Sequence, residues 1–83
     1  MTYKVVFSVE AAAELVSMAG KIRPAAAVIS AADTIRQLLE IEPRKAGHLL
    51  SEGLWYIDAE PLRAFFVIDD DAMQVEITDF RQL

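Results

Sequence analysis

The spacing of apolar residues along this 83-residue sequence restricts the folds open to it. Residues 3–7 are a short run rich in β-branched and aromatic side chains, which predicts a strand, and their low charge favours a position inside a sheet. Residues 9–18 and 24–40 repeat apolar side chains at steps of three and four residues, which predicts two amphipathic helices. Because the link between them is short, these helices should form a hairpin.

Capping residues mark where the two helices begin and end. Ser8 is a typical N-cap for the first helix, and Gly20 is placed to be the C′ residue just beyond its end. Pro24 suits the first turn of the second helix, and Pro43 ends it. Residues 43–53 follow with two glycines and predict a loop.

Three further runs predict strands at residues 54–57, 62–68 and 73–80. Short polar turns separate them, and the last run alternates apolar and polar residues from Met73 onward. The three strands should therefore form an antiparallel meander that shares one sheet with the N-terminal strand. The prediction is one α+β domain over residues 1–83, in the order β-α-α-β-β-β, with the helical hairpin packed on one face.

Composition excludes several classes of function. The chain has no cysteine, so it has no disulfide, no thiol nucleophile and no thiolate metal site, and a reducing, cytoplasmic location is expected. No apolar run is long enough to span a membrane or to act as a signal peptide. The net charge of −5 predicts weak direct binding of nucleic acid at most. No sequence motif indicates a cofactor.

The order of the predicted elements resembles that of the RelE/ParE superfamily, the toxins of type II toxin–antitoxin systems, which include plasmid-stabilisation proteins. The resemblance runs from Tyr3 to Arg81 and is sharpest in the second half. There Pro43 and Gly47 precede LSEGLWYI, and PLRAFFVIDDDAMQVEITDFR follows with an arginine near the start of a strand, aromatics, an acidic hairpin and a final apolar strand.

This resemblance implies a partner and two modes of action. One branch of the superfamily cleaves messenger RNA on the ribosome, and the other poisons DNA gyrase without nuclease chemistry. In both branches a cognate antitoxin wraps the toxin and neutralises it. The resemblance therefore implies an antitoxin as partner and the ribosome or DNA gyrase as target.

Two arginines match catalytic positions of the nuclease branch. Arg63 stands where that branch has an arginine on the scissile phosphate, and Arg81 matches the basic residue after the last strand. A guanidinium can hold phosphate oxygens through paired hydrogen bonds. The alternative for Arg63 is an outward strand residue that bridges Asp58, Glu60 or Glu76.

Two other features of the nuclease branch are missing. Phe80 takes the place expected for its histidine, and no tyrosine follows Arg81. Phenylalanine neither donates nor accepts a proton, so general acid–base catalysis is disfavoured. The sequence leans against an enzyme, and if the chain is one, messenger RNA endonuclease is the expected activity.

Arg44, Lys45 and His48 are candidates for binding a phosphate or a partner. Arg44 and Lys45 fall where nuclease members carry lysines or a glutamate, although a solvated helix end explains them as well. His48 is the only histidine, and without cysteines it cannot complete a metal site by itself. No metal is expected, and the acids of the 69–71 turn lack the spacing of a calcium loop.

Aromatic residues supply a candidate partner surface, because neighbours on a strand point to opposite faces. One of each adjacent pair should pack under the helices and the other should face outward. The proposed surface consists of Trp55, Tyr56, Phe65, Phe66 and Phe80. With this negative charge, we expect it to bind protein, either an antitoxin segment or a second copy in a homodimer.

These observations leave three hypotheses. The first is a RelE/ParE-like protein of a toxin–antitoxin module that acts mainly through protein binding. The second is a messenger RNA endonuclease that uses Arg63 and Arg81. The third is a degenerate, non-toxic member kept as a binding or regulatory module.

Overall fold

The computed structural model describes residues 2–83. In chain order, the elements are β1 (Lys4–Phe7), α1 (Val9–Lys21), α2 (Ala25–Ile41), α3 (Pro43–Ala46), β2 (His48–Ser51), β3 (Leu54–Ala59), β4 (Leu62–Asp69) and β5 (Gln74–Gln82).

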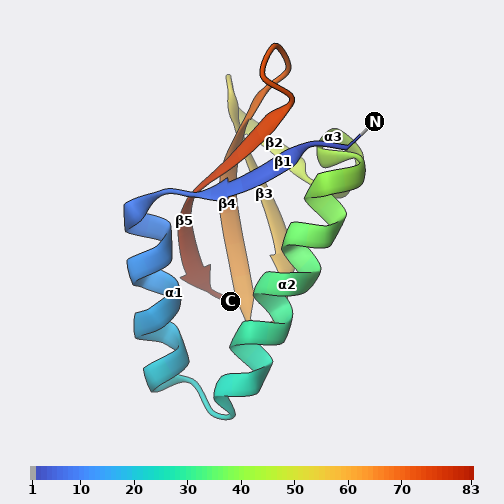
Figure 1. Ribbon diagram of the computed structural model, residues 1–83. Coiled ribbons are helices and arrows are strands. Elements are labelled where there is room, and N and C mark those ends of the chain that lie inside the picture. Colours follow the sequence, from blue (N-terminus) through green and yellow to red (C-terminus); the bar gives the residue numbers. More distant parts are fainter. Residues whose placement is uncertain (1) are drawn as a thin grey trace.

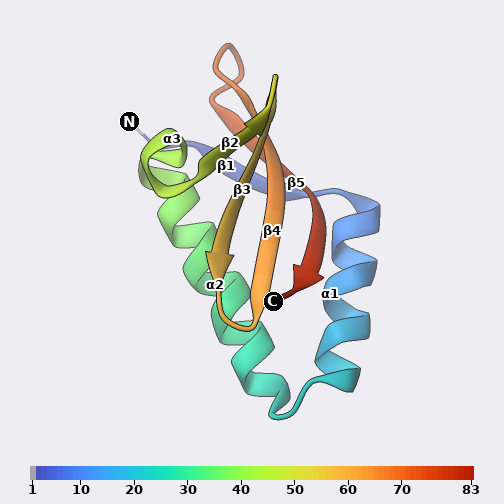
Figure 2. The same cartoon turned by 180° about the vertical axis from the view of Figure 1, so that it is seen from behind.

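All five strands form one sheet in the order β1-β5-β4-β3-β2. β1 pairs in parallel with β5, and the other neighbours pair antiparallel. Helices α1 and α2 lie on the same side of the sheet (Figure 1), and the view from behind shows no helix in front of it (Figure 2). The predicted α+β class, the meander β3-β4-β5 and the helical hairpin on one face are confirmed.

The core lies between the hairpin and the sheet. Alternate residues of the strands and one stripe of α2 are buried there, because a strand repeats every two residues and a helix every 3.6. The buried set is Ala11, Val28, Ala31, Ala32, Ile35, Leu39, Ile57, Leu62, Ala64, Phe66, Val75, Ile77 and Phe80. The opposite face of the sheet therefore carries the side chains that can act on solvent or a partner.

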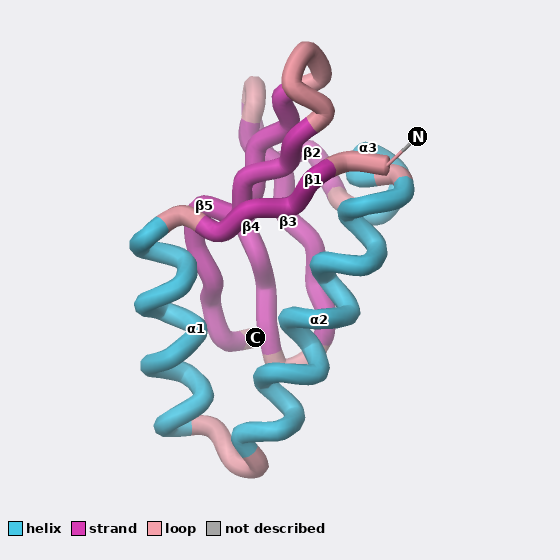
Figure 3. The backbone as a smooth tube through the Cα atoms, viewed as in Figure 1, coloured by secondary structure: helices cyan, strands magenta, loops and turns pink. Residues whose placement is uncertain are grey.

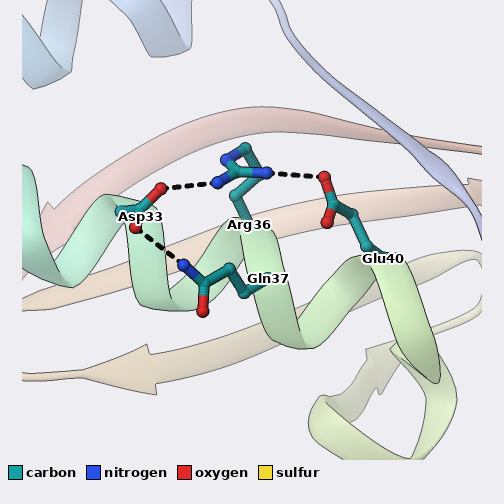
Figure 4. A network of polar contacts seen from close by, with 4 residues as sticks. All are labelled: Asp33, Arg36, Gln37 and Glu40. Atoms are coloured by element: carbon teal, nitrogen blue, oxygen red, sulfur yellow. Dashed lines mark hydrogen bonds and ion pairs between the residues drawn. The ribbon is translucent and has the colours of Figure 1, made fainter.

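Polar side chains fix the ends and the outer face of the helices. The Ser8 hydroxyl accepts a hydrogen bond from the Ala11 N–H at 3.0 Å, as predicted for an N-cap. On α2, Arg36 donates to Asp33 and Glu40 at 2.6 Å each, and Gln37 donates to Asp33 (Figure 4). Pairs at this spacing support the helix weakly, because solvent screens exposed charges.

Three predictions about the first half are wrong in detail. β1 lies at an edge of the sheet, and its apolar side chains Val5 and Phe7 pack against the core from there. Gly20 lies inside α1 and not beyond it, because the helix continues to Lys21. Pro24 is the N-cap of α2, one residue before the predicted first turn.

The predicted loop at residues 43–53 is also wrong. This segment contains the short helix α3 and the edge strand β2, which follow α2 and precede β3 along the chain (Figure 3). Gly47 joins α3 to β2. No larger residue fits there, because a Cβ would lie 2.5 Å from Cζ of Phe66. Gly53 has φ +79° in the turn from β2 to β3, a backbone conformation that favours glycine.

Within residues 2–83, no helix combines the length and the apolarity needed to cross a membrane.

Candidate functional site on the open face of the sheet

Strand register brings the two predicted arginines together. Arg63 of β4 lies directly opposite Asp58 of β3 on one side and Arg81 of β5 on the other. Residues opposite each other on paired strands share a face of the sheet. Since Leu62 and Ala64 on either side of Arg63 are buried under the helices, this row lies on the open face.

A second row lies two residues further along the same face. Phe65 of β4 is opposite Tyr56 of β3 and Asp79 of β5, and Tyr56 is in turn opposite His48 of β2. We call the two rows the open-face cluster. Its members are His48, Tyr56, Asp58, Arg63, Phe65, Asp79 and Arg81.

Arg63 is held by two of its neighbours. Its Nε donates to Oδ1 of Asp58 at 2.7 Å and its Nη2 to Oδ2 at 2.9 Å, a bidentate pair. The guanidinium carbon lies 4.4 Å from the centre of the Tyr56 ring, within range of a cation–π contact. Asp58 therefore occupies one of the two bidentate edges of the guanidinium, the one formed by Nε and Nη2.

Arg81 borders an open groove. Its Nε lies 3.6 Å from an Asp79 oxygen, and its guanidinium carbon lies 5.8 Å from the centre of the Phe65 ring. The groove has a volume of about 420 Å³ and is lined by Leu50, Leu54, Phe65, Thr78, Asp79 and Arg81. Its lining combines apolar with polar and charged side chains, as protein-binding surfaces do.

A β-bulge at Thr78 is what places Arg81 on this face. Strict alternation after Val75 and Ile77 would put Arg81 with the core. The register of β5 against β4 shifts at this point, so that Asp79 is opposite Phe65 while Ile77 is opposite Phe66. The shift leaves Thr78 as the extra residue and turns Arg81 outward.

The open-face cluster is not a basic patch. It contains two arginines and two aspartates, and their formal charges cancel. A surface that binds nucleic acid through phosphates needs excess positive charge. The arrangement suits a partner that can bury apolar side chains and exchange hydrogen bonds with paired charges.

The Asp58 pKa reflects this pairing. Hydrogen bonds from the Arg63 guanidinium lower the pKa of the Asp58 carboxyl below its ordinary value of 3.8, although burial opposes the shift. At the tip of the β4–β5 hairpin, hydrogen bonds from Arg44 and then from Tyr3 lower the pKa of Asp70 in the same way. Both shifts contribute stability that is present above the ordinary carboxyl pKa of 3.8 and is lost as the pH falls through the lowered values.

Replacing Arg63 by alanine should return the Asp58 pKa to its ordinary range and leave that of Asp70 lowered. Arg44→Ala should do the reverse, which makes each variant the control for the other. Carbon-detected NMR titration of the side-chain carboxyls measures both values. A wild-type Asp58 that titrates at its ordinary pKa would contradict the ion pair.

Arg44 and Lys45 do not join the open-face cluster. Arg44 lies at the hairpin tip, where it donates to both Asp70 oxygens at 2.9 and 2.6 Å and lies 6.0 Å from the Trp55 ring. Lys45 is exposed and 3.5 Å from Glu42. His48 does join the cluster, since its ring lies 5.1 Å from that of Tyr56. The four predicted basic residues thus fall into separate places, and only Arg63 and Arg81 converge.

The aromatic residues divide as alternation predicts. Phe66 and Trp55 face the helices, with ring centres 6.4 Å apart, while Phe65 and Tyr56 face outward. The assignment of Phe66 and Phe80 to a partner surface is wrong, because both are buried in the core. Phe80 also points away from Arg63 and Arg81, so it does not stand at the position of a catalytic group beside them.

No group of three or more potential metal ligands is found among the described residues 2–83. The acids of the hairpin tip serve other contacts: Asp70 holds Arg44, and the Asp69 side chain accepts from the Ala72 N–H at 3.1 Å.

Sequence reasoning missed Asp79 and the groove residues Leu50 and Leu54. Asp79 lies two residues before Arg81, so the two side chains share a face of β5. The sequence does not show which face this is, because the bulge is not visible in it. Asp58 was considered only as an alternative partner of Arg63, and its place five residues earlier, across a two-residue turn, is the signal for a cross-strand pair.

Comparison with known proteins rests on structure. No family model matches the chain, and no curated protein matches its sequence. Three similar solved structures are the RelBE2 toxin–antitoxin complex from Mycobacterium tuberculosis, the chromosomal ParDE toxin–antitoxin system from P. aeruginosa and the archaeal RelE–RelB complex from Pyrococcus horikoshii.

The likeness spans almost all of the chains compared. TM-scores are 0.80, 0.78 and 0.71 at 23%, 20% and 19% identity. The alignments cover 100%, 98% and 99% of this chain and 93%, 96% and 96% of the others. The chain therefore has the fold of the RelE/ParE toxin superfamily.

Proposed function

We propose that this chain is the toxin-fold component of a toxin–antitoxin module, acts in the cytoplasm mainly through protein binding, and has an antitoxin as its main partner. The fold supports the module, since all three similar structures are toxin–antitoxin systems or complexes. The mode of action rests on one observation: Asp58 already holds one bidentate edge of Arg63 and neutralises its charge.

The electrostatics of the open face support this mode. A polyanion would have to compete with Asp58 for the charge of Arg63 and approach a chain of net charge −5. A protein partner needs neither step. It can bury the Phe65 and Leu54 side chains in the groove and leave the ion pair intact. DNA gyrase, as a protein, is compatible with such a surface.

The second candidate is a ribosome-dependent messenger RNA endonuclease. The observation that favours it is the meeting of Arg63 and Arg81 with Tyr56 and His48 on one face. These side chains include two phosphate-binding groups and two that can exchange protons. In this mode, a substrate phosphate would have to share Arg63 with the Asp58 carboxylate or replace it.

Three variants separate the two candidates when the chain is induced alone in a bacterium. Phe65→Asp should abolish growth arrest if the groove binds protein, because it puts a charge on the apolar floor. Arg63→Ala should abolish arrest only if the chain is a nuclease. Arg36→Ala, which removes an equally ion-paired arginine from the outer face of α2, is the control and should leave arrest unchanged.

Protein synthesis, messenger RNA cleavage and chromosome breakage are followed in the same cultures. Early chromosome breakage with intact messages supports the binding mode directed at gyrase. Message cleavage that Arg63→Ala removes would overturn the binding mode. Growth without arrest in the wild type would mean a non-toxic module. Co-purification with the product of an adjoining short reading frame, lost in Phe65→Asp, tests the antitoxin.

A further inference from the structure

The segment from α3 through β2, residues 43–51, is weakly anchored, and we call it the edge segment. Only Pro43 and Gly47 are buried in it, and none of its large apolar side chains belongs to the core. β2 pairs with β3 alone, and the register shifts between Leu49 and Ser51. A segment with so little buried apolar surface opens at a lower free energy than the whole domain.

One side chain ties the edge segment to the β4–β5 hairpin. Arg44 of α3 donates to both oxygens of Asp70 at the hairpin tip, at 2.9 and 2.6 Å, although the two residues are 26 positions apart in sequence. Among residues 2–83, the other ion pair of the segment joins Lys45 to nearby Glu42 at 3.5 Å, so it fixes the segment to no distant element. The position of α3 relative to the hairpin therefore depends on the Arg44–Asp70 pair.

Asp70 is itself held in place. The Tyr3 hydroxyl donates to Oδ1 of Asp70 at 2.8 Å, and the Met73 N–H donates to the Asp70 carbonyl oxygen across the turn at 3.2 Å. Tyr3 is bound in turn, because its N–H donates to the Glu40 carbonyl oxygen in the last turn of α2 at 2.8 Å. The Asp70 carboxylate is thus a fixed point, while Arg44 is carried on the weakly anchored segment.

The edge segment also supplies one end of the groove on the open face. Leu50 lies in β2 at the register shift and lines the groove, whereas Thr78 and Arg81 line it from β5. Since β4 and β3 lie between β5 and β2 in the sheet, Leu50 is at the opposite end of the groove from Thr78. Any movement of β2 away from β3 therefore changes the shape of the groove.

We propose that the edge segment is a flap and that Arg44 and Asp70 are its latch. While the ion pair is formed, β2 stays on the sheet and Leu50 lines the groove; when the pair breaks, the flap opens and the groove loses that end. The side chains of the pair are 49% and 55% exposed, so solvent screens the pair and the latch opens reversibly. This device concerns the shape of the groove and does not depend on what the groove binds.

NMR measurement of amide exchange with water in the full chain tests the latch. Asp70→Asn should speed the exchange of the amides of residues 45–51 by about two- to fivefold, as expected for the loss of an exposed ion pair, and leave those of α2 and β4 unchanged. Asp71→Asn is the matched control, because it removes the same charge from the same turn and Asp71 forms no ion pair within residues 2–83. The control should exchange as the wild type does.

Two further readouts distinguish a latch from a contact that only steadies the hairpin. In Asp70→Asn, the methyl signals of Leu50 should shift, while that of Thr78 at the other end of the groove should not. Arg44→Ala should speed exchange as Asp70→Asn does, and the double variant no more than either alone, because both changes remove one contact. Faster exchange confined to residues 69–73 or spread over the whole chain, unmoved Leu50 signals, or additive effects in the double variant would overturn the proposal.

Discussion

Replacing Phe80 by alanine is expected to lower the free energy of unfolding by about 3–5 kcal/mol, the largest effect among the single changes considered for this chain. The residue is 1% exposed, and its ring centre lies 5.7 Å from that of Phe7, so removal leaves a cavity in the core beside Phe7. Urea unfolding followed by circular dichroism measures the loss. Small domains have little stability to spare, so Phe80→Leu, expected to cost less, keeps the effect measurable if the alanine variant does not fold.

Phe65→Ala is the matched comparison, because it removes the same ring from the open face, where it is only half-buried. We expect it to cost about 1 kcal/mol, in proportion to the apolar area that it loses. Equal losses at the two positions would contradict the bulge at Thr78, which alone decides that Phe80 faces the core and Arg81 the open face.

That bulge also explains where sequence reasoning failed. Alternation from Val75 to Ile77 is regular, and nothing in the letters of residues 78–80 indicates an extra residue. A bulge is chosen by tertiary contacts: the Ser8 hydroxyl donates to the Thr78 carbonyl oxygen, and Phe80 gains the Phe7 ring. Once the phase of the strand is shifted by one, every later side chain changes face.

The helices were easier to predict than the β2 edge. Seventeen residues of α2 repeat a strong apolar pattern, whereas β2 is four residues with two adjacent leucines and no β-branched residue. Such a strand forms because β3 is already in place to pair with it. The site also depends on pairing between strands. The sequence marked Arg63 and Arg81 as candidates, but strand register decides that they share a face and which aspartates they contact.

The resemblance in element order predicted the fold, but not the chemistry of the site. The sequence offered Asp58, Glu60 and Glu76 as possible partners of Arg63 beside a free guanidinium, and only the strand register selects Asp58. Asp58 lies on the preceding strand β3, and its contact with Arg63 is what makes a phosphate-binding role for Arg63 less favourable.

Gly47→Ala is expected to destabilise the protein by about 1–3 kcal/mol, at the upper end for adding one methyl group to a packed core. A Cβ at this position would lie 2.5 and 2.9 Å from two carbons of the Phe66 ring and 3.1 Å from the Tyr56 carbonyl oxygen. Phe66 is completely buried, so its ring cannot swing aside, and the carbonyl belongs to the backbone of β3. The strain must therefore push β2 away from the sheet, and urea unfolding should show it.

Gly20→Ala provides the control, because it adds the same methyl group inside α1 with nothing within 4 Å of the new Cβ. That variant should gain about 0.5–1 kcal/mol, since alanine favours the helix over glycine. A smaller side chain at position 66 supplies a further check: in Gly47→Ala with Phe66→Leu, the two losses should be less than additive, because the leucine leaves room for the methyl group. Strictly additive losses would mean that a methyl group at position 47 does not contact the Phe66 ring. Its only close contact would then be with the backbone carbonyl of Tyr56.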